Sequence, residues 1–238
     1  MDAHYTYLLL DLITILGPLA LSFDKRVAFY KQWRALLPGL LLTGAVFVAW
    51  DVAFTRLGVW RFAEGYTLGV KWLGLPVEEW LFFLTVPYAC AFVVACVRAY
   101  GRWEGRDWGW RVFPVLGLLL EWAGIIYLNR WYTATTFIGA GFALQIVWVV
   151  RKRLPHFRAD AFLVGYALCL IPFFIVNGIL TALPIVIYND AENLGIRLYT
   201  IPFEDAFYGM LLILGSAIGL RGKLGSAHDT NGTSPPTS

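Results

Sequence analysis

The chain has 238 residues, of which 59% are hydrophobic, 17% aromatic and only 15% charged. Soluble domains are about one quarter charged, and a mean hydropathy of +0.64 is unusual for them. The composition therefore excludes an ordinary soluble domain and indicates an integral membrane protein. The net charge is only +3, and the Lys and Arg residues lie mainly in the connections between apolar runs. The charge therefore does not indicate a nucleic-acid partner.

Seven apolar runs follow one another along the chain. A helix needs roughly 20 apolar residues to cross the hydrocarbon of a bilayer, and most of these runs approach that length, the fourth being the shortest. The runs are continuous rather than alternating, which argues against a β-barrel. We predict an all-α integral membrane protein with seven transmembrane helices. The predicted spans are residues 5–23, 36–54, 76–97, 113–128, 132–150, 161–183 and 201–220.

Basic residues are distributed unevenly between the two sides of these spans. Most of the 19 Lys and Arg residues lie in the connections after spans one, three and five, or in the C-terminal tail. Because basic residues concentrate on the cytoplasmic side, we predict a multi-pass protein of the cell (inner) membrane with its N-terminus outside and its C-terminus in the cytoplasm. The tail, residues 221–238, is polar and rich in small residues and Pro, and is predicted to be disordered.

Two segments of the chain align with each other without a gap. They read LGVKWLGLPVEEWLFFL from Leu68 and LGIRLYTIPFEDAFYGM from Leu194, and the same offset aligns Asp51 with Asn177. Spans one to three then correspond to spans five to seven, and the even number of spans between equivalent helices gives both halves the same orientation. We predict two parallel three-helix repeats joined by a linker helix. The predicted units are residues 1–105, a linker span within 106–130, and residues 131–220.

Each repeat places two adjacent carboxylates after a proline, at the start of an apolar span. The pairs are Glu78 with Glu79 and Glu204 with Asp205. Proline and acids are also ordinary helix-start signals, although no Ser or Thr stands at the position that a capping box requires. Two copies at equivalent sites favour function, because ionisable residues in a membrane are costly and usually functional. We predict that these four residues are catalytic and act as general acids or proton acceptors.

Aromatic residues flank both acid pairs and are predicted to bind substrate. Aromatic faces stabilise cations, although a belt of rings at the membrane interface is an equally compatible explanation. Asp51 and Asn177 lie near the ends of spans two and six, where we predict that they hydrogen-bond the acids or a water molecule. The predicted substrate-binding residues are Trp72, Trp80, Phe82, Phe83, Tyr199, Phe203, Phe207 and Tyr208.

Motifs for nucleotides, flavins and metals are missing from the sequence. There is no G-x-G-x-x-G and no P-loop, and the three Cys and three His residues lack metal-ligand spacing. The segment YNDAEN at Tyr188 weakly resembles the Asp-rich magnesium site of prenyltransferases, but no second acidic cluster accompanies it. We therefore predict no cofactor and no metal.

The paired motifs resemble those of a known family. The segments LPVEEWLFF and NGILTALPIVIYNDAENLGIRLYTIPFEDAFYGMLL are similar to those of the membrane-integral lycopene β-cyclases, whose two homologous small subunits occur separately or fused. The resemblance covers most of the chain and implies the fused form. It implies a flavin-independent activity in carotenoid biosynthesis, namely redox-neutral cyclisation of the ψ-ends of lycopene to β-rings, through γ-carotene to β-carotene. Its implied partners are lycopene, other acyclic carotenoids and the lipid bilayer.

The resemblance also assigns roles within the acid pairs. It makes Glu78 and Glu204 the principal acids and Glu79 and Asp205 their partners or proton acceptors. Alternatives are a carotenoid end-group hydratase, a cyclase of C50 carotenoids, a magnesium-dependent membrane prenyltransferase and a non-enzymatic carrier. A homo-oligomer, or contact with other carotenoid enzymes, is compatible with the sequence.

Overall fold

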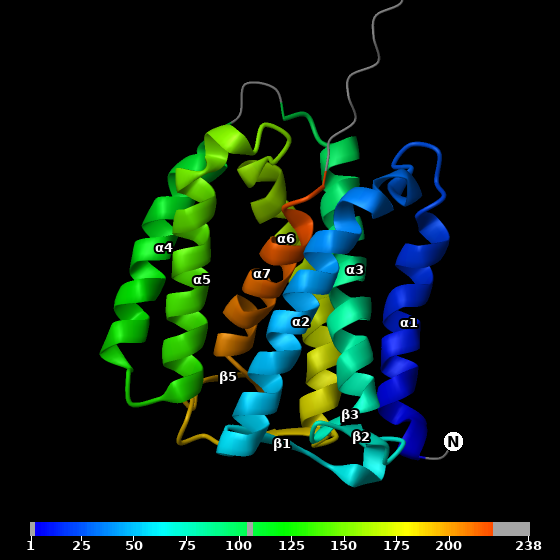
Figure 1. Cartoon of the computed structure of the whole chain (residues 1–238), viewed down its shortest axis with the longest axis vertical. Coiled ribbons are helices and arrows are strands. Elements are labelled where there is room, and N and C mark those ends of the chain that lie inside the picture. Colours follow the sequence, from blue (N-terminus) through cyan, green and yellow to red (C-terminus); the bar gives the residue numbers. More distant parts are fainter. Residues whose placement is uncertain (1–2, 104–106, 221–238) are drawn as a thin grey trace, which may run out of the picture.

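A computed structural model describes residues 3–103 and 107–220, which form one bundle of roughly parallel and antiparallel helices (Figure 1). Short 3-10 turns precede α1 and α2. The two halves of the chain share this bundle, and helices from both halves are interleaved in it. The seven helices are α1 (Thr6–Leu21), α2 (Trp33–Leu57), α3 (Val77–Tyr100), α4 (Trp108–Ile126), α5 (Trp131–Val149), α6 (Ala159–Ala182) and α7 (Glu204–Ala217).

Six of the seven predicted spans are long and apolar enough to cross a membrane, and such a set fits a membrane protein. The exception is α7, which has 14 residues, because its predicted start forms a strand and its last residues leave the helix before Leu220. The fourth span is longer than predicted and begins at Trp108, directly after Asp107. A seventh crossing stays a prediction, and the predicted tail and the boundary at residues 105–106 lie outside the described residues.

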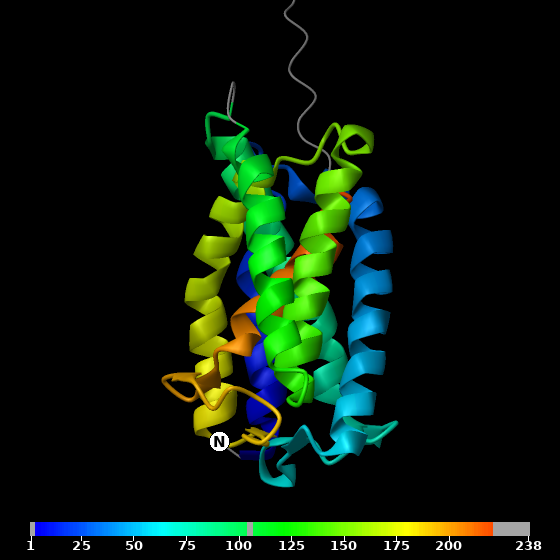
Figure 2. The same cartoon turned by 90° about the vertical axis from the view of Figure 1, so that its left-hand side faces the viewer.

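Each half of the chain packs against the other in the same pattern. Helix α1 packs on α3 and α5 packs on α7, while α2 lies against α7 and α6 against α3. Helices α3 and α7, which carry the acid pairs, each contact four other helices. Helix α4 stands at the edge of the bundle against α5 (Figures 1 and 2). Glycines allow that close approach, because a Cβ on Gly141 would come within 2.6 Å of the Gly117 carbonyl oxygen.

The connections at one end of the bundle form three short antiparallel ladders that the sequence did not predict. Two are tight hairpins that directly precede the acid pairs. Their backbones match at two positions with positive φ: Leu73 (φ 52°) corresponds to Tyr199 (φ 61°), and Gly69 (φ 76°) to Gly195 (φ 71°). The hairpins are β2 (Lys71–Trp72) with β3 (Leu75–Pro76), and β5 (Arg197–Leu198) with β6 (Ile201–Pro202).

The third ladder joins the two halves of the chain. Strand β1 (Trp60–Phe62) pairs with β4 (Val186–Tyr188), and Arg61 lies opposite Ile187. These two strands occupy equivalent places in the predicted repeat, so a segment pairs with its own counterpart. Antiparallel pairing of this kind is what a two-fold axis along the bundle would produce. The ladder closes the bundle at the end where the acid pairs lie (Figure 1).

Candidate active site

Both acid pairs lie buried at the first turns of their helices. Glu78 and Glu79 are the second and third residues of α3, which begins at Val77. Glu204 and Asp205 are the first two residues of α7. All four side chains are at most 6% exposed. Adjacent residues on an α-helix point about 100° apart, so the two carboxyls of one pair face different surroundings.

The first carboxyl of each pair is bonded to the loop that precedes its helix. Glu78 Oε1 accepts a hydrogen bond from the backbone N–H of Leu68 at 2.6 Å, and Glu204 Oε1 accepts one from Leu194 at 2.7 Å. Glu204 also accepts a hydrogen bond from the hydroxyl of Thr133 at 2.6 Å. Neither side chain lines the cavity described below. The first carboxyls therefore hold the loops against the helix starts.

The second carboxyl of each pair accepts hydrogen bonds from tyrosine. Glu79 Oε2 accepts a hydrogen bond from the Tyr7 hydroxyl at 2.5 Å. Asp205 accepts one from Tyr132 and another from Tyr188, the latter at 2.9 Å. Tyr7 and Tyr132 lie in the first turns of α1 and α5, so both halves supply a tyrosine from the same place in the helix pattern.

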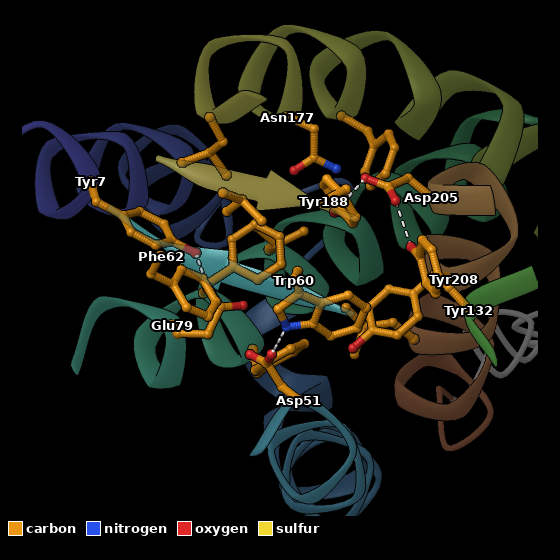
Figure 3. Close-up of a pocket in the computed structure, with 18 of the residues that line it drawn as sticks. Tyr7, Asp51, Trp60, Phe62, Glu79, Tyr132, Asn177, Tyr188, Asp205 and Tyr208 are labelled. Atoms are coloured by element: carbon orange, nitrogen blue, oxygen red, sulfur yellow. Dashed lines mark hydrogen bonds between the residues drawn. The ribbon is translucent and has the colours of Figure 1, made fainter. Parts of the chain in front are cut away.

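Glu79 and Asp205 line one narrow cavity, of about 50 Å³, inside the bundle (Figure 3). Aromatic rings form much of its wall. Trp60 lies at the centre of the view, with Asp51 and Glu79 on one side of it and Asp205 on the other. Its ring centroid is 5.2 Å from that of Tyr132 and 6.2 Å from that of Tyr208. The cavity is thus a carboxyl-bearing pocket walled by π-faces.

Asp51 and Asn177, predicted as supporting polar groups, both line this cavity. Asp51 accepts a hydrogen bond from the Trp60 indole N–H, and its carboxyl lies against that of Glu79. Two ionised carboxyls in contact repel each other, so a proton held between them stabilises such a pair. Among the described residues that line the cavity, none is Lys, Arg or His, so no basic side chain there neutralises these carboxyls.

The predicted aromatic residues divide between the cavity and other places. Phe82, Phe83 and Tyr208 line the cavity. Trp72 is 62% exposed and stacks on Trp80, with centroids 4.4 Å apart, and Tyr199 is 83% exposed. The remaining two rings pack on α5. Phe203 and Phe207 contact Phe137, with centroids 6.4 and 5.2 Å away.

Six aromatic residues of the cavity were not predicted: Tyr7, Trp60, Phe62, Tyr132, Phe173 and Tyr188. The two helical tyrosines carry a sequence signal, because they match when the first and fifth spans are aligned one residue away from the offset of the acid pairs. Trp60 and Tyr188 are opposite one another in the β1–β4 ladder, and no local pattern in the sequence indicates that pairing.

Charged residues at the rim are paired with each other rather than with the cavity acids. Lys71 lies 2.7 Å from Glu64, and its hydrogen bond lowers the pKa of that carboxyl. Arg197 forms an ion pair with Asp190 and in the same way lowers the pKa of Asp190.

The Tyr188 hydroxyl, which bonds Asp205, remains a hydrogen-bond donor. Burial of the ring, and next the nearby carboxyl of Asp205, raise the pKa of Tyr188 well above its usual value.

Within residues 3–103 and 107–220, no group of three or more His, Cys, Asp and Glu side chains is arranged to hold a metal ion. The segment at Tyr188 contributes a ring to the cavity wall, while its Asp190 points to Arg197 at the rim. The absence of a cofactor stays a prediction.

Comparison with known proteins gives a consistent result. A family model described as lycopene cyclase matches residues 4–97 and 129–220. A protein of Pyrenophora tritici-repentis (strain Pt-1C-BFP), named bifunctional lycopene cyclase/phytoene synthase, is 24% identical over 169 residues. That match covers 56% of this chain and 29% of the relative, so the chain spans under a third of that protein's length. No solved structure matches the chain.

The loop-holding role of the first carboxyls predicts a stability difference between two substitutions. Glu204→Ala leaves the Leu194 N–H and the Thr133 hydroxyl without their acceptor, which should cost about 1–3 kcal/mol for each buried group left unpaired. Glu204→Gln keeps an acceptor oxygen and should lose less. Thermal unfolding of the purified protein measures both. An Ala variant that melts at the wild-type temperature would contradict this role.

Proposed function

We propose that this chain, which belongs to the lycopene cyclase family, closes the linear ψ-ends of lycopene into β-rings, producing γ-carotene and then β-carotene. Family membership supports a carotenoid-cyclising enzyme that acts in a lipid environment. The identity of the ring and the acid-initiated mechanism are our proposal. It rests on one observation, namely that three buried carboxyls line a cavity walled by aromatic rings.

The proposed reaction begins with transfer of a proton to C2 of the ψ-end. The π-electrons of the C1=C2 bond form the new C–H bond and leave a tertiary cation at C1. The C5=C6 double bond then attacks C1, closes a six-membered ring and moves the charge to C5. Loss of the C6 proton completes the C5=C6 double bond of the β-ring. One proton enters and one leaves, so the product is an isomer of the substrate and no redox cofactor is needed.

The surroundings of the two cavity acids support different roles. Glu79 lies against Asp51, an arrangement in which a proton is held between two carboxyls, and we assign this pair as the general acid. Asp205 accepts hydrogen bonds from two tyrosine hydroxyls, the arrangement of a carboxylate, and we assign it as the base that takes the C6 proton. Trp60 lies between them, and its π-face can stabilise the intermediate cation.

This proposal exchanges the roles that the family resemblance assigned within each pair. Glu78 and Glu204 hold loop backbone and do not line the cavity, whereas Glu79 and Asp205 do. We therefore propose that the second residue of each pair performs the chemistry and that the first positions it.

We also propose that the two halves are repeats related by a two-fold axis, with the N-terminus outside the cell and the acid pairs near the outer face of the membrane. The matched backbone angles of the two hairpins and the pairing of β1 with its counterpart β4 support the repeat. The excess of basic residues at the opposite end of the bundle supports this orientation.

The reaction predicts how isotope enters the product. In D₂O with unlabelled lycopene, each ring should gain one deuterium at C2, because the carboxyl proton exchanges with solvent. Mass spectrometry and NMR of the product from purified, flavin-free protein measure this. A product without deuterium would contradict protonation by an exchangeable acid, and a product heavier by one water would indicate a hydratase.

The assigned roles predict which substitutions stop turnover. Glu79→Gln and Asp205→Asn should each lower turnover by about 100-fold or more, because an amide is too weak an acid and too weak a base to transfer the required proton. Glu78→Gln is the matched control for Glu79→Gln, since it replaces the neighbouring carboxyl by an amide yet keeps an acceptor for the Leu68 N–H. It should retain far more activity at equal protein levels. The reverse ranking would return the acid role to Glu78.

A further inference from the structure

An apolar groove runs along the lipid-facing side of α1, α3 and α6. Its volume is about 320 Å³, within the range of small-molecule sites. Its wall includes Ile13 and Pro18 of α1, Val93 of α3 and Val176 of α6, and its polar contributions are Thr14 and Asn177. Ile13 is 68% exposed, so the groove opens sideways to the hydrocarbon of the bilayer.

The groove adjoins the cavity that holds the acids. Phe82, Val86, Phe173 and Asn177 line both. From this junction the groove follows α3 from Phe82 to Val93, a rise of roughly 16 Å at 1.5 Å per residue. A ligand lying in the groove would thus have one end directed at Glu79, Asp51 and Asp205.

A second pocket, of about 290 Å³, lies at the end of the bundle beyond the cavity and shares Val186 and Tyr188 with it, but its wall includes the charged Arg197. There the β1–β4 ladder lies over the cavity, and Trp60, Phe62, Val186 and Tyr188 from its two strands are part of the cavity wall. An apolar substrate that entered from this end would also have to pass the charged rim, where Lys71 pairs with Glu64. The lateral groove adjoins the cavity, and none of the described residues that line it is charged.

The corresponding place in the other half of the bundle is filled by one side chain. Val176 of the groove aligns with Trp50 of α2 in the predicted repeat. The Trp50 ring packs on Tyr208, with centroids 5.4 Å apart, and lies 3.7 Å from the Cβ position of Gly139 on α5. Tryptophan closes the gap between helices in one half, whereas valine at the matching position leaves a groove in the other.

We propose that the groove between α1, α3 and α6 binds the conjugated chain of the carotenoid and admits its end group sideways from the bilayer. This inference rests on the proposed function. The long polyene of an acyclic carotenoid is apolar, uncharged and rod-shaped, as the groove requires, and its end group must reach the acids while the remainder stays in an apolar place. A ligand in this groove directs only one of its ends at the acids, so the two ends of one molecule would be processed in turn, with release and re-entry between them.

Enlarging position 176 tests the proposal, because Val176→Trp would place in the groove the side chain that fills the equivalent gap. In a Glu79→Gln background that prevents turnover, purified protein in lipid nanodiscs is incubated with lycopene, and the pigment retained per protein is measured by absorbance. Val176→Trp should reduce retention by about tenfold, which corresponds to 1.4 kcal/mol of binding free energy. Val176→Leu should give a smaller loss, so the test does not depend on accumulation of the tryptophan variant.

Ile171→Trp is the matched control. It also introduces a tryptophan on α6, at a position that is 62% exposed and outside the groove wall. The Ile171→Trp variant should retain as much lycopene as the parent. Equal retention by the Val176 variants and the parent would overturn the proposal. So would loss of a co-purified phospholipid from the Val176 variants with no loss of lycopene, since the groove would then hold lipid. If the wild-type chain retained lycopene through Val176 but made no cyclic product, the proposed function would fail and the groove would stand.

Discussion

Two neighbouring carboxyls at the start of a helix cannot face the same way, and the site depends on this constraint. In both α3 and α7, the first carboxyl turns to the preceding loop and accepts its backbone N–H, at Leu68 or Leu194. Because the first carboxyl faces the loop, the second carboxyl points about 100° away from it, toward the middle of the bundle. Two helices that begin in this manner bring Glu79 and Asp205 to opposite sides of one cavity.

The helix packing determines why these two carboxyls meet. Helix α2 lies on α7 and α6 lies on α3, so residues from both halves of the chain line the same cavity. Asp51 from the first half lies beside Glu79, while Asn177 and Tyr188 from the second half close the same cavity. The β1–β4 ladder joins the two halves at the end of the bundle where the site lies. A single half would present its acid without the complete wall of aromatic rings that encloses the cavity.

Burial among rings gives the carboxyls a chemistry that they would lack in water. In the proposed reaction, water would quench the carbocation, whereas π-faces such as that of Trp60 would stabilise it and leave only the neighbouring double bond to react. Hydrogen bonds from tyrosine orient the acids without bringing a positive charge into the cavity. Within the described lining there is no basic side chain that would bind a proton more tightly than the acids do.

Much of this arrangement could be predicted from the sequence, because it depends on local patterns. Continuous apolar runs indicated the helices, and the duplicated acid pairs with Asp51 and Asn177 indicated the site. The length of α7 was wrong by several residues, because a hairpin strand at Ile201–Pro202 takes up the predicted start of the span. The direction of each carboxyl was not predictable, since it depends on which of two adjacent acids the loop backbone contacts. Tyr7 and Tyr132 were missed because their alignment is displaced by one residue from that of the acids.

The central claim is that the second acid of each pair faces the reacting end of the substrate. Electron cryo-microscopy of the Glu79→Gln variant with bound lycopene tests it most directly. The account predicts that the ψ-end lies against the ring of Trp60, between residue 79 and Asp205, with the polyene leaving along α3 toward Val93. A ψ-end in contact with Glu78 or Glu204, with Asp205 remote from it, would contradict the account.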